Sequence, residues 1–263
     1  MLGAIIGDII GSRFERFNYK GKDFELFHES CRMTDDSVLT LAVADAFMNK
    51  KDYAQTIKEY GRANPLAGYG GSFVAWLDSA DSKPYNSWGN GSAMRISALP
   101  WLIDDSAELM EEAKKSAEVT HNHPEGIKGA QAVAMAIWMA IRVKNKEEIK
   151  AYIETTFGYD LNRTVKSLVE TYEFDVSCQG SVPEAIICFL ESTSFEDCIR
   201  TAISIGGDSD TIASMSGAIA EAFYGTESIS EELDEYALIK VAKNSKYADV
   251  AMQFNEIMNV KTA

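Results

Sequence analysis

The stretch GGDSDTIASMSGAIAEAFY, residues 206–224, places two glycines and four oxygen-bearing side chains directly before a small-residue apolar segment. This pattern predicts a helix over 208–224 with the oxygen donors at its start. Helix N-termini favour aspartate because their N–H groups are unpaired and carry partial positive charge, so Asp208 and Asp210 could simply cap the helix. The same donors also suit a hard cation such as Mg²⁺, Mn²⁺ or Ca²⁺.

A second stretch, far upstream, has the same character. The sequence TDDS, residues 34–37, precedes apolar residues at mostly helical spacing and predicts a helix over 35–49. Capping requires one oxygen donor per helix, whereas each of these two starts brings two aspartates and a threonine. The surplus favours a pair of Mg²⁺ ions shared by the two clusters, with carboxylates bridging them.

Composition places limits on the class of protein. With 263 residues and a hydrophobic fraction of 46%, the chain can fill one large core. Asp and Glu outnumber Lys and Arg by 40 to 25, and the formal charge of −15 makes nucleic acid and anionic membranes unlikely partners over most of the surface. The four cysteines lack zinc-ligand spacing, so we expect free thiols in a reducing cytosol. The apolar N-terminal run is short and interrupted by Asp8, which does not fit a signal peptide or membrane span and predicts a cytoplasmic protein.

Helical patterns follow one another along nearly the whole chain, and only residues 30–33 suggest a strand. The segment 126–143 is apolar on most faces, which is typical of a central helix. The fold class is therefore predicted as all-α, one compact multi-helix domain over 1–263. The expected helices cover 2–12, 35–49, 53–62, 93–102 with a kink or break at Pro100, 104–119, 126–143, 146–157, 163–172, 182–192, 195–204, 208–224, 230–242 and 245–259.

Several loop residues could carry chemistry. The glycine-rich loops 68–73 and 84–92 could present N–H groups to a phosphate, or merely turn the chain. Glu15 follows the first helix in a polar loop and is a candidate catalytic carboxylate, although an isolated loop glutamate is more often a surface residue. His121 and His123 are too few, and wrongly spaced, for a zinc site. No G-x-S-x-G elbow, P-loop or dinucleotide fingerprint is present.

Two magnesium ions held by such clusters could bind a vicinal diol and orient a water molecule. Either a glycosidic or a phosphate-ester bond could then be cleaved, with Glu15 acting as a base or as an electrostatic stabiliser of a cationic transition state. The residue types alone leave both reactions open.

Seven blocks of the sequence, taken together, resemble the ADP-ribosylglycohydrolase family, in particular its dinitrogenase-reductase-activating type. The blocks occur in the family's order over most of the chain, which is specific although each short block alone is weak. They are GAIIGDIIGSRFE (3–15), MTDDS (33–37), GYGG (68–71), SWGNGSAMR (87–95), TH (120–121), GSVPEA (180–185) and GGDSDTI (206–212).

This resemblance implies an all-α fold with two Mg²⁺ ions, or Mn²⁺ in their place, at the base of a cleft, and it implies that Glu15 is the catalytic glutamate. The implied metal ligands are Thr34, Asp35, Asp36, Asp208, Asp210 and Thr211. The implied substrate-binding residues are Gly70, Gly71, Ser87, Trp88, Gly89, Asn90, Gly91 and His121. In this assignment the loop 87–90 holds a diphosphate through its backbone amides, and Trp88 stands where relatives often carry tyrosine.

The implied activity is hydrolysis of the glycosidic bond at C1″ of ADP-ribose attached to a protein side chain or a small acceptor, with release of free ADP-ribose. The expected partner is therefore an ADP-ribosylated protein or a small ADP-ribose conjugate; the sequence identifies neither the leaving group nor an oligomeric state. Two alternatives remain. One is a binuclear-metal phosphohydrolase or another nucleotide-sugar hydrolase. The other is a non-catalytic structural role, as in lens crystallins of a similar fold, although the retained acidic residues favour an enzyme.

Overall fold

The computed structural model describes residues 1–262, and this part of the chain contains helices and loops but no strand, which confirms the all-α prediction. The predicted domain ends at residue 263, which lies outside the described part. The first helices are α1 (Leu2–Gly11), α2 (Asp35–Met48), α3 (Tyr53–Ala63), α4 (Gly71–Asp78), α5 (Gly91–Met94), α6 (Leu99–Leu102), α7 (Ser106–Glu118) and α8 (Pro124–Arg142). They are followed by α9 (Lys146–Phe157), α10 (Val165–Thr171), α11 (Cys178–Glu191), α12 (Phe195–Ser204), α13 (Ser209–Tyr224), the 3₁₀ turn η1 (Thr226–Ser228), α14 (Glu231–Val241) and α15 (Ser245–Thr262).

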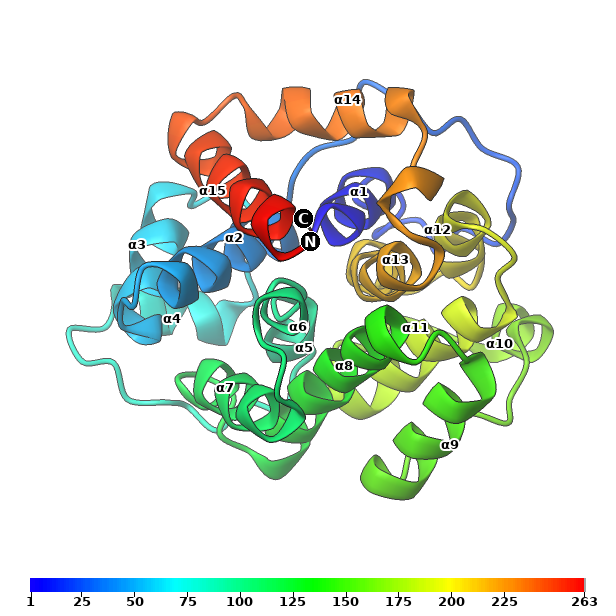
Figure 1. Cartoon of the computed structure of the whole chain (residues 1–263), viewed down its shortest axis with the longest axis horizontal. Helices are drawn as coiled ribbons and strands as arrows, with labels where there is room; N and C mark the ends of the chain where they lie inside the picture. Colours follow the sequence, from blue (N-terminus) through cyan, green and yellow to red (C-terminus); the bar gives the residue numbers. More distant parts are fainter. Residues whose placement is uncertain (263) are drawn as a thin grey trace.

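Helix α13 lies at the centre of the fold, in contact with α1, α8, α11 and α12 (Figure 1). Every residue from Ser209 to Ala222 is buried, and most of them are alanine, serine, glycine or isoleucine. Small side chains let several helices approach α13 at once, which explains how one helix can have neighbours on all sides. Helix α8 is also largely buried, as predicted for 126–143, and it contacts α13 as well as α5, α7, α9 and α11.

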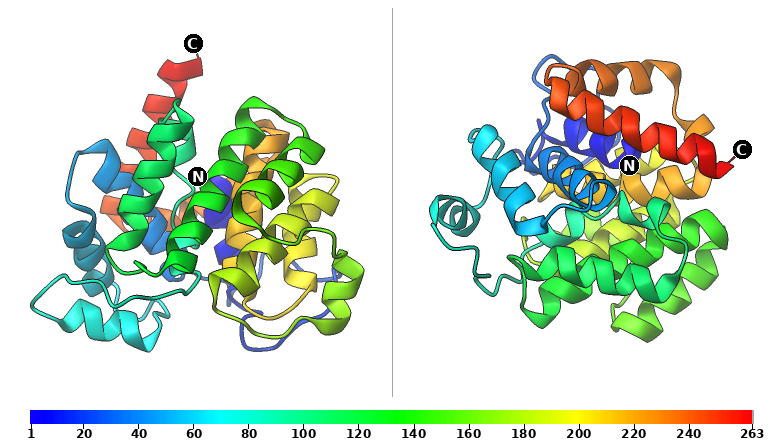
Figure 2. Two further views of the ribbon diagram at one scale, coloured as in Figure 1. Left: turned by 90° about the horizontal axis from the view of Figure 1, so that it is seen from below. Right: turned by 60° about the vertical axis from the view of Figure 1, so that its left-hand side comes forward.

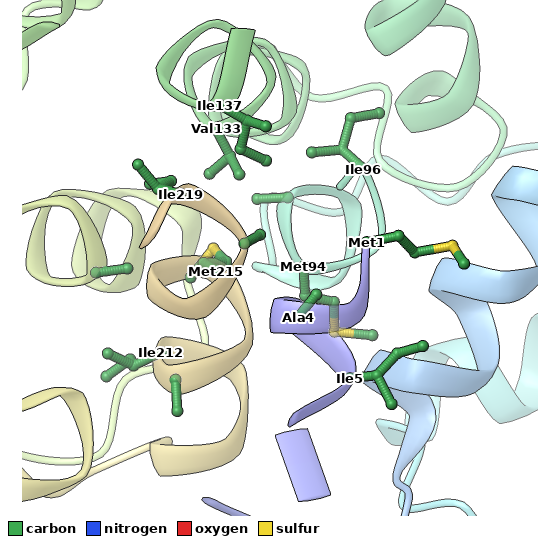
Figure 3. Close-up of a cluster of buried hydrophobic side chains, with 14 of the residues drawn as sticks. Met1, Ala4, Ile5, Met94, Ile96, Val133, Ile137, Ile212, Met215 and Ile219 are labelled. Carbon is green, nitrogen blue, oxygen red and sulfur yellow. The ribbon is translucent and has the colours of Figure 1, made fainter. Parts of the chain in front are cut away.

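Helices α1 and α13 touch through their backbones. A Cβ atom at Gly11 would lie 2.6 Å from the Cα of Asp210, and one at Gly7 would collide with the carbonyl of Ala213. Only glycine fits at these positions, so the glycines of α1 define a close helix pair, called here the glycine seam. Figure 3 shows the apolar side chains beside the seam, where α1, α8, α13 and the segment around residues 94–96 meet in one cluster.

Three local expectations were wrong. Residues 30–33 are irregular rather than a strand, and the turn before them is closed by Cys31 N–H donating to His28 O. The helix predicted over 93–102 is broken, as expected, but over residues 95–98 rather than at Pro100, which sits in the first turn of α6 where its missing N–H costs nothing. Helix α11 begins at Cys178 instead of 182, because the Ser177 side chain caps it by accepting from Gly180 N–H.

The C-terminal helices α14 and α15 cover the side of the molecule formed by α1 and α2 (Figure 2). All four cysteines are free, as predicted, and the structure buries all of them. Among the described residues, no helix combines the length and the apolar character needed to cross a bilayer.

Candidate metal centre and substrate cavity

A cavity of about 400 Å³ opens where the N-termini of α2 and α13 meet. Both acidic clusters predicted from the sequence reach it, although they are far apart in the chain. The cavity is lined on this side by Glu15, Asp35, Asp36, Asp208, Asp210 and Thr211. The remaining predicted ligand, Thr34, is buried beside Asp36 and does not line the cavity.

The carboxylates are close enough to share cations. Oxygen atoms of Asp8, Asp36 and Asp210 all lie within 4.8 Å of one another. The Thr211 hydroxyl donates to Asp36 Oδ2 over 3.2 Å and so joins the two helix starts. The second oxygen of this carboxylate, Asp36 Oδ1, is buried and has no hydrogen-bond partner within residues 1–262. An unsatisfied buried carboxylate oxygen is costly unless a cation compensates it, so this donor set fits a hard divalent metal.

Helix capping does not account for Asp208. This residue occupies the N-cap position of α13, yet its side chain makes no capping hydrogen bond. Its Oδ2 atom instead accepts from Asn90 Nδ2 over 2.6 Å. The Asp210 carboxylate does accept from an N–H of the first turn, that of Thr211, but it lines the cavity together with Asp208. Neither carboxylate is therefore used up by the helix end.

Asp8 was missed by the sequence interpretation. It is fully buried in α1, and Oδ1 accepts from the Thr34 hydroxyl over 2.5 Å while Oδ2 accepts from the N–H groups of Thr34 and Ser37. The Ser37 hydroxyl also donates to Oδ2. Asp8 thus caps the start of α2 from a neighbouring helix and fixes the predicted ligand Thr34. The available signal was a single charged residue within the Gly/Ile run of 3–11.

The crowded carboxylates hold protons more tightly than isolated ones. Burial, and then repulsion from Asp8, raises the pKa of Asp35 from 3.8 to about 7. Burial raises the pKa of Asp208 to about 6. The pKa values of Asp36 and Asp210 are raised well above 3.8 by burial and then by neighbouring aspartates. Without a cation, this cluster is therefore charged only at an energetic cost.

The metal-free protein should lose stability as the pH rises from about 4 to about 7. A carboxyl with a raised pKa binds its proton more tightly in the folded state than in the unfolded state. The free energy of unfolding therefore falls as the pH rises from the pKa of the unfolded chain, 3.8, to the pKa of the folded protein, which is about 7 for Asp35 and about 6 for Asp208. Melting temperatures in EDTA should fall by roughly 5 °C or more over this window. Saturating Mg²⁺ should flatten the profile, because a cation favours the ionised carboxylates. Equal profiles in EDTA and Mg²⁺ would contradict cation binding at this cluster.

Glu15 lines the same cavity from the loop that follows α1. Asn18 Oδ1 accepts from Gly207 N–H over 3.0 Å, and Lys20 Nζ donates to Tyr172 O over 2.7 Å. Lys20 also donates to Ile205 O, at the C-terminal end of α12. The loop is therefore fastened to the turn that precedes Asp208. This turn requires glycine, because Gly206 and Gly207 have φ values of +72° and +71°.

The loop 87–91 is paired with residues 176–178. Asn90 N–H donates to Val176 O over 2.8 Å, and Cys178 N–H donates to Trp88 O over 2.9 Å. The N–H groups of Ser87 and Gly89 donate to Thr120 O and to Ser87 Oγ. Three of the amides predicted to hold a diphosphate thus already donate to oxygen atoms of the protein. Their role in phosphate binding stays a prediction, and the loop would have to exchange these hydrogen bonds for bonds to the phosphates.

The remaining predicted contacts divide into two groups. Seven of the predicted substrate-binding residues line the cavity, namely Gly70, Gly71, Ser87, Gly89, Asn90, Gly91 and His121. At Gly70 and Gly71 an added Cβ would meet no atom within 4 Å, so these glycines keep part of the cavity open. Trp88 is not among the lining residues; its side chain is 54% exposed and lies against the His123 ring at a centroid distance of 5.7 Å. Its predicted substrate contact stays untested.

Arg95, a buried residue that the sequence interpretation also missed, positions the His121 ring through Thr120. Arg95 Nη2 donates to Ser116 O over 2.7 Å and to the Thr120 hydroxyl over 3.0 Å, and this hydroxyl lies 2.7 Å from His121 Nδ1. Burial, and then the Arg95 charge, keep the pKa of His121 well below 6.5, so the ring is neutral at pH 7. The Thr120 hydroxyl, which accepts from Arg95, can donate to Nδ1 and leave Nε2 with the proton. Nε2 lies beside Gly89 and Gly91, at the loop edge of the cavity.

Comparison with known proteins places this arrangement in a family. The ADP-ribosylglycohydrolase family profile matches residues 1–255. The chain is 26% identical to ADP-ribosylhydrolase ARH3 of Gallus gallus, over 87% of this chain and 85% of that protein, and 24% identical to ARH3 of Homo sapiens, over 88% and 86%. It is also 24% identical to ADP-ribosylarginine hydrolase Tri1 of Pseudomonas putida, over 88% of this chain and 71% of that protein.

A solved structure supports the fold. A chain described as an ADP-ribosylglycohydrolase-related protein complex superposes with a TM-score of 0.65 at 23% identity, covering 90% of this chain and 94% of the other. At that identity the likeness concerns the fold alone. The match of the family profile over nearly the whole sequence shows more: this chain belongs to the ADP-ribosylglycohydrolase family, a family of hydrolytic enzymes.

Proposed function

We propose that this protein hydrolyses the glycosidic bond at C1″ of ADP-ribose attached to a protein side chain or a small acceptor, and that the reaction depends on two Mg²⁺ ions, for which Mn²⁺ can substitute. The observation that carries the proposal is the meeting of two aspartate clusters and Glu15 in one cavity. The relatives named as ADP-ribosylhydrolase and ADP-ribosylarginine hydrolase support it.

The metal ligands in this proposal are Thr34, Asp35, Asp36, Asp208, Asp210 and Thr211, with Asp8 holding Thr34 in place. When bound, divalent cations would supply electrophilic stabilisation to the ribose hydroxyls and to the attacking water. The chain's own contribution is to pre-organise the oxygen donors. Asn90 orients Asp208, and Thr211 orients Asp36, so neither carboxylate has to be repositioned when substrate arrives.

Glu15 is the proposed catalytic residue. Its carboxylate would accept a proton from the water that attacks C1″, and its negative charge would stabilise the oxocarbenium-like transition state. The C1″ bond to the acceptor breaks, the water oxygen becomes the new 1″-hydroxyl, and the acceptor leaves with the bonding electron pair and a proton. The Asn18 and Lys20 contacts hold the Glu15 loop against the turn before Asp208, which keeps this carboxylate at the cavity.

The cavity volume of about 400 Å³ is within the range of sites for small ligands. Gly70 and Gly71 would leave room for the ribose next to the acidic floor. At the other end, the Nε2–H of His121 would donate to a ribose or phosphate oxygen, because a Thr120 hydroxyl that donates to Nδ1 leaves the proton of the neutral ring on Nε2.

The test is mass-spectrometric detection of free ADP-ribose from arginine-linked, serine-linked and nucleobase-linked ADP-ribose, each with Mg²⁺ and with EDTA. Release that requires Mg²⁺ is the expected result. Release of inorganic phosphate instead would favour a phosphohydrolase. No product from any conjugate, combined with no Mg²⁺ binding by calorimetry, would favour a structural role.

A further inference from the structure

A second hollow lies next to the cavity and shares Glu15 with it. It has a volume of about 280 Å³ and is lined, apart from Glu15, by Ser12, Arg13, Arg16, Phe17, Ser30 and Arg32. We call it the arginine hollow. Glu15 belongs to both depressions, so the arginine hollow begins where the catalytic carboxylate stands.

The three arginines of the hollow have no anionic partner. Within residues 1–262 their guanidinium groups make no hydrogen bond and no ion pair; Arg13 lies 4.4 Å from the centroid of the Phe14 ring and 6.0 Å from that of Phe24. The other five arginines of the chain all donate to carbonyl or carboxylate oxygens, namely Arg62, Arg95, Arg142, Arg163 and Arg200. In a chain with 40 acidic residues and a net charge of −15, three unpaired arginines in one hollow form a distinct cationic surface.

The cavity and the hollow are opposite in charge. The cavity floor carries the aspartate clusters, whereas the hollow carries the arginines, and Glu15 stands between them. If Glu15 acts at C1″, the acceptor attached to C1″ must leave the cavity near Glu15. Two depressions adjoin this point, and both contain Arg16; the arginine hollow is the one that brings three arginines together. This step rests on the proposed function. An acceptor with negative charge close to the linkage would therefore meet arginine side chains.

We infer that the arginine hollow binds the acidic side chains that flank an ADP-ribosylated residue, so the preferred substrate is an acidic segment of a modified protein. Two further features favour a peptide over nucleic acid. Phe17, 78% exposed, offers an apolar contact beside the arginines. Glu25 lines the adjoining depression together with Arg13 and Phe17, and the whole chain is acidic, so a long phosphate backbone would be repelled beyond the hollow.

The volume of the arginine hollow, about 280 Å³, suits contact with a short peptide segment. Successive residues of an extended peptide are about 3.3 Å apart, so carboxylates on either side of the modified residue can reach neighbouring arginines at the same time. Arg16 and Arg32 are exposed and Arg13 is half-buried, so all three can be replaced with little effect on the core. Because exposed ion pairs are individually weak and are screened by salt, three of them should contribute a selectivity of roughly tenfold at low ionic strength.

The experiment compares three synthetic peptides that carry ADP-ribose on the same residue through the same linkage, flanked by acidic, neutral or lysine residues. The wild-type protein should show a kcat/KM roughly tenfold higher for the acidic than for the neutral peptide, mainly through KM, and the preference should shrink with added salt. The combined substitutions Arg13→Gln, Arg16→Gln and Arg32→Gln should bring the acidic-to-neutral ratio close to one. The pair Arg16→Gln and Arg32→Gln, which leaves Arg13 on Phe14, should lower it partly.

The matched control removes the same charge elsewhere: Lys50→Gln, Lys144→Gln and Lys166→Gln, all at exposed positions, should keep the acidic preference. Equal kcat/KM values for the three peptides, or an acidic preference that survives loss of the arginines, would overturn the inference while the proposed function stands. Faster, arginine-dependent release from an ADP-ribosylated oligonucleotide than from the acidic peptide would also overturn it, in favour of nucleic acid.

Failure of the proposed function has a different signature, because the wild-type protein would then release ADP-ribose from none of the conjugates. In that case fluorescence anisotropy with a labelled, unmodified acidic peptide decides the inference. Binding that the arginine substitutions abolish supports the arginine hollow as an acidic-peptide site, and no binding at low salt refutes it.

Discussion

Replacing Asp210 with asparagine should lower kcat/KM for release of ADP-ribose by roughly 10³-fold, which corresponds to a few kcal/mol of lost transition-state stabilisation. The substitution preserves the shape of the side chain but removes a carboxylate that lies within 4.8 Å of Asp8 and Asp36 oxygens. Stabilisation by Mg²⁺, measured as the rise in melting temperature on titration, should be largely lost as well.

The same variant should be more stable than the wild-type protein in EDTA. Burial and the neighbouring carboxylates disfavour the ionised form of Asp210, so removal of its charge relieves repulsion in the metal-free state. This opposite effect on activity and on metal-free stability separates a ligand from a residue that only supports the fold. Asp249→Asn, at an exposed position of α15, should change neither quantity. An Asp210→Asn protein with normal Mg²⁺-dependent turnover would show that the centre is assigned to the wrong residues.

Replacing Glu15 with glutamine should lower kcat by roughly 10²- to 10⁴-fold, the range associated with loss of a general base. The Mg²⁺-induced rise in melting temperature should persist, because Glu15 comes from the loop after α1 and not from the two helix starts that hold the aspartates. The combination of lost turnover and retained metal binding distinguishes Glu15 from Asp210.

The control for Glu15 is Glu29→Gln, which removes an exposed carboxylate from the same loop and should leave kcat unchanged. A loss of turnover of the same size in Glu29→Gln would show that removal of charge from the loop, and not the Glu15 carboxylate itself, is responsible.

The sequence was sufficient for features that are encoded locally. The helix starts at Thr34 and Asp208 were predictable because oxygen-rich residues directly precede apolar helical patterns, and the two clusters do meet in one cavity. Glu15 was a candidate from its loop position, but only the resemblance assigned it the catalytic role, since an isolated loop glutamate has no distinguishing pattern. The structure now provides a local reason for its position, because Asn18 and Lys20 fasten its loop to the Gly206–Gly207 turn.

Other features depend on contacts between distant segments, and no local pattern encodes them. Asp8 caps a helix that begins far along the chain, so its partners appear only when α1 lies beside the start of α2. Arg95 looked like an ordinary helix residue, but it is fully buried between α5 and α6 and orients His121 through Thr120. The break over residues 95–98 places Arg95 there, whereas the predicted break was at Pro100.

The glycine seam has a consequence for how the chain tolerates substitution away from the cavity. A Cβ atom at Gly11 would lie 2.6 Å from the Cα of Asp210, so even Gly11→Ala must push the start of α13 away from α1. The start of α13 carries Asp208, Asp210 and Thr211, which line the cavity. The smallest added side chain on α1 would therefore displace carboxylates that face the other way, because the main chains of two packed helices set the position of the acidic cluster.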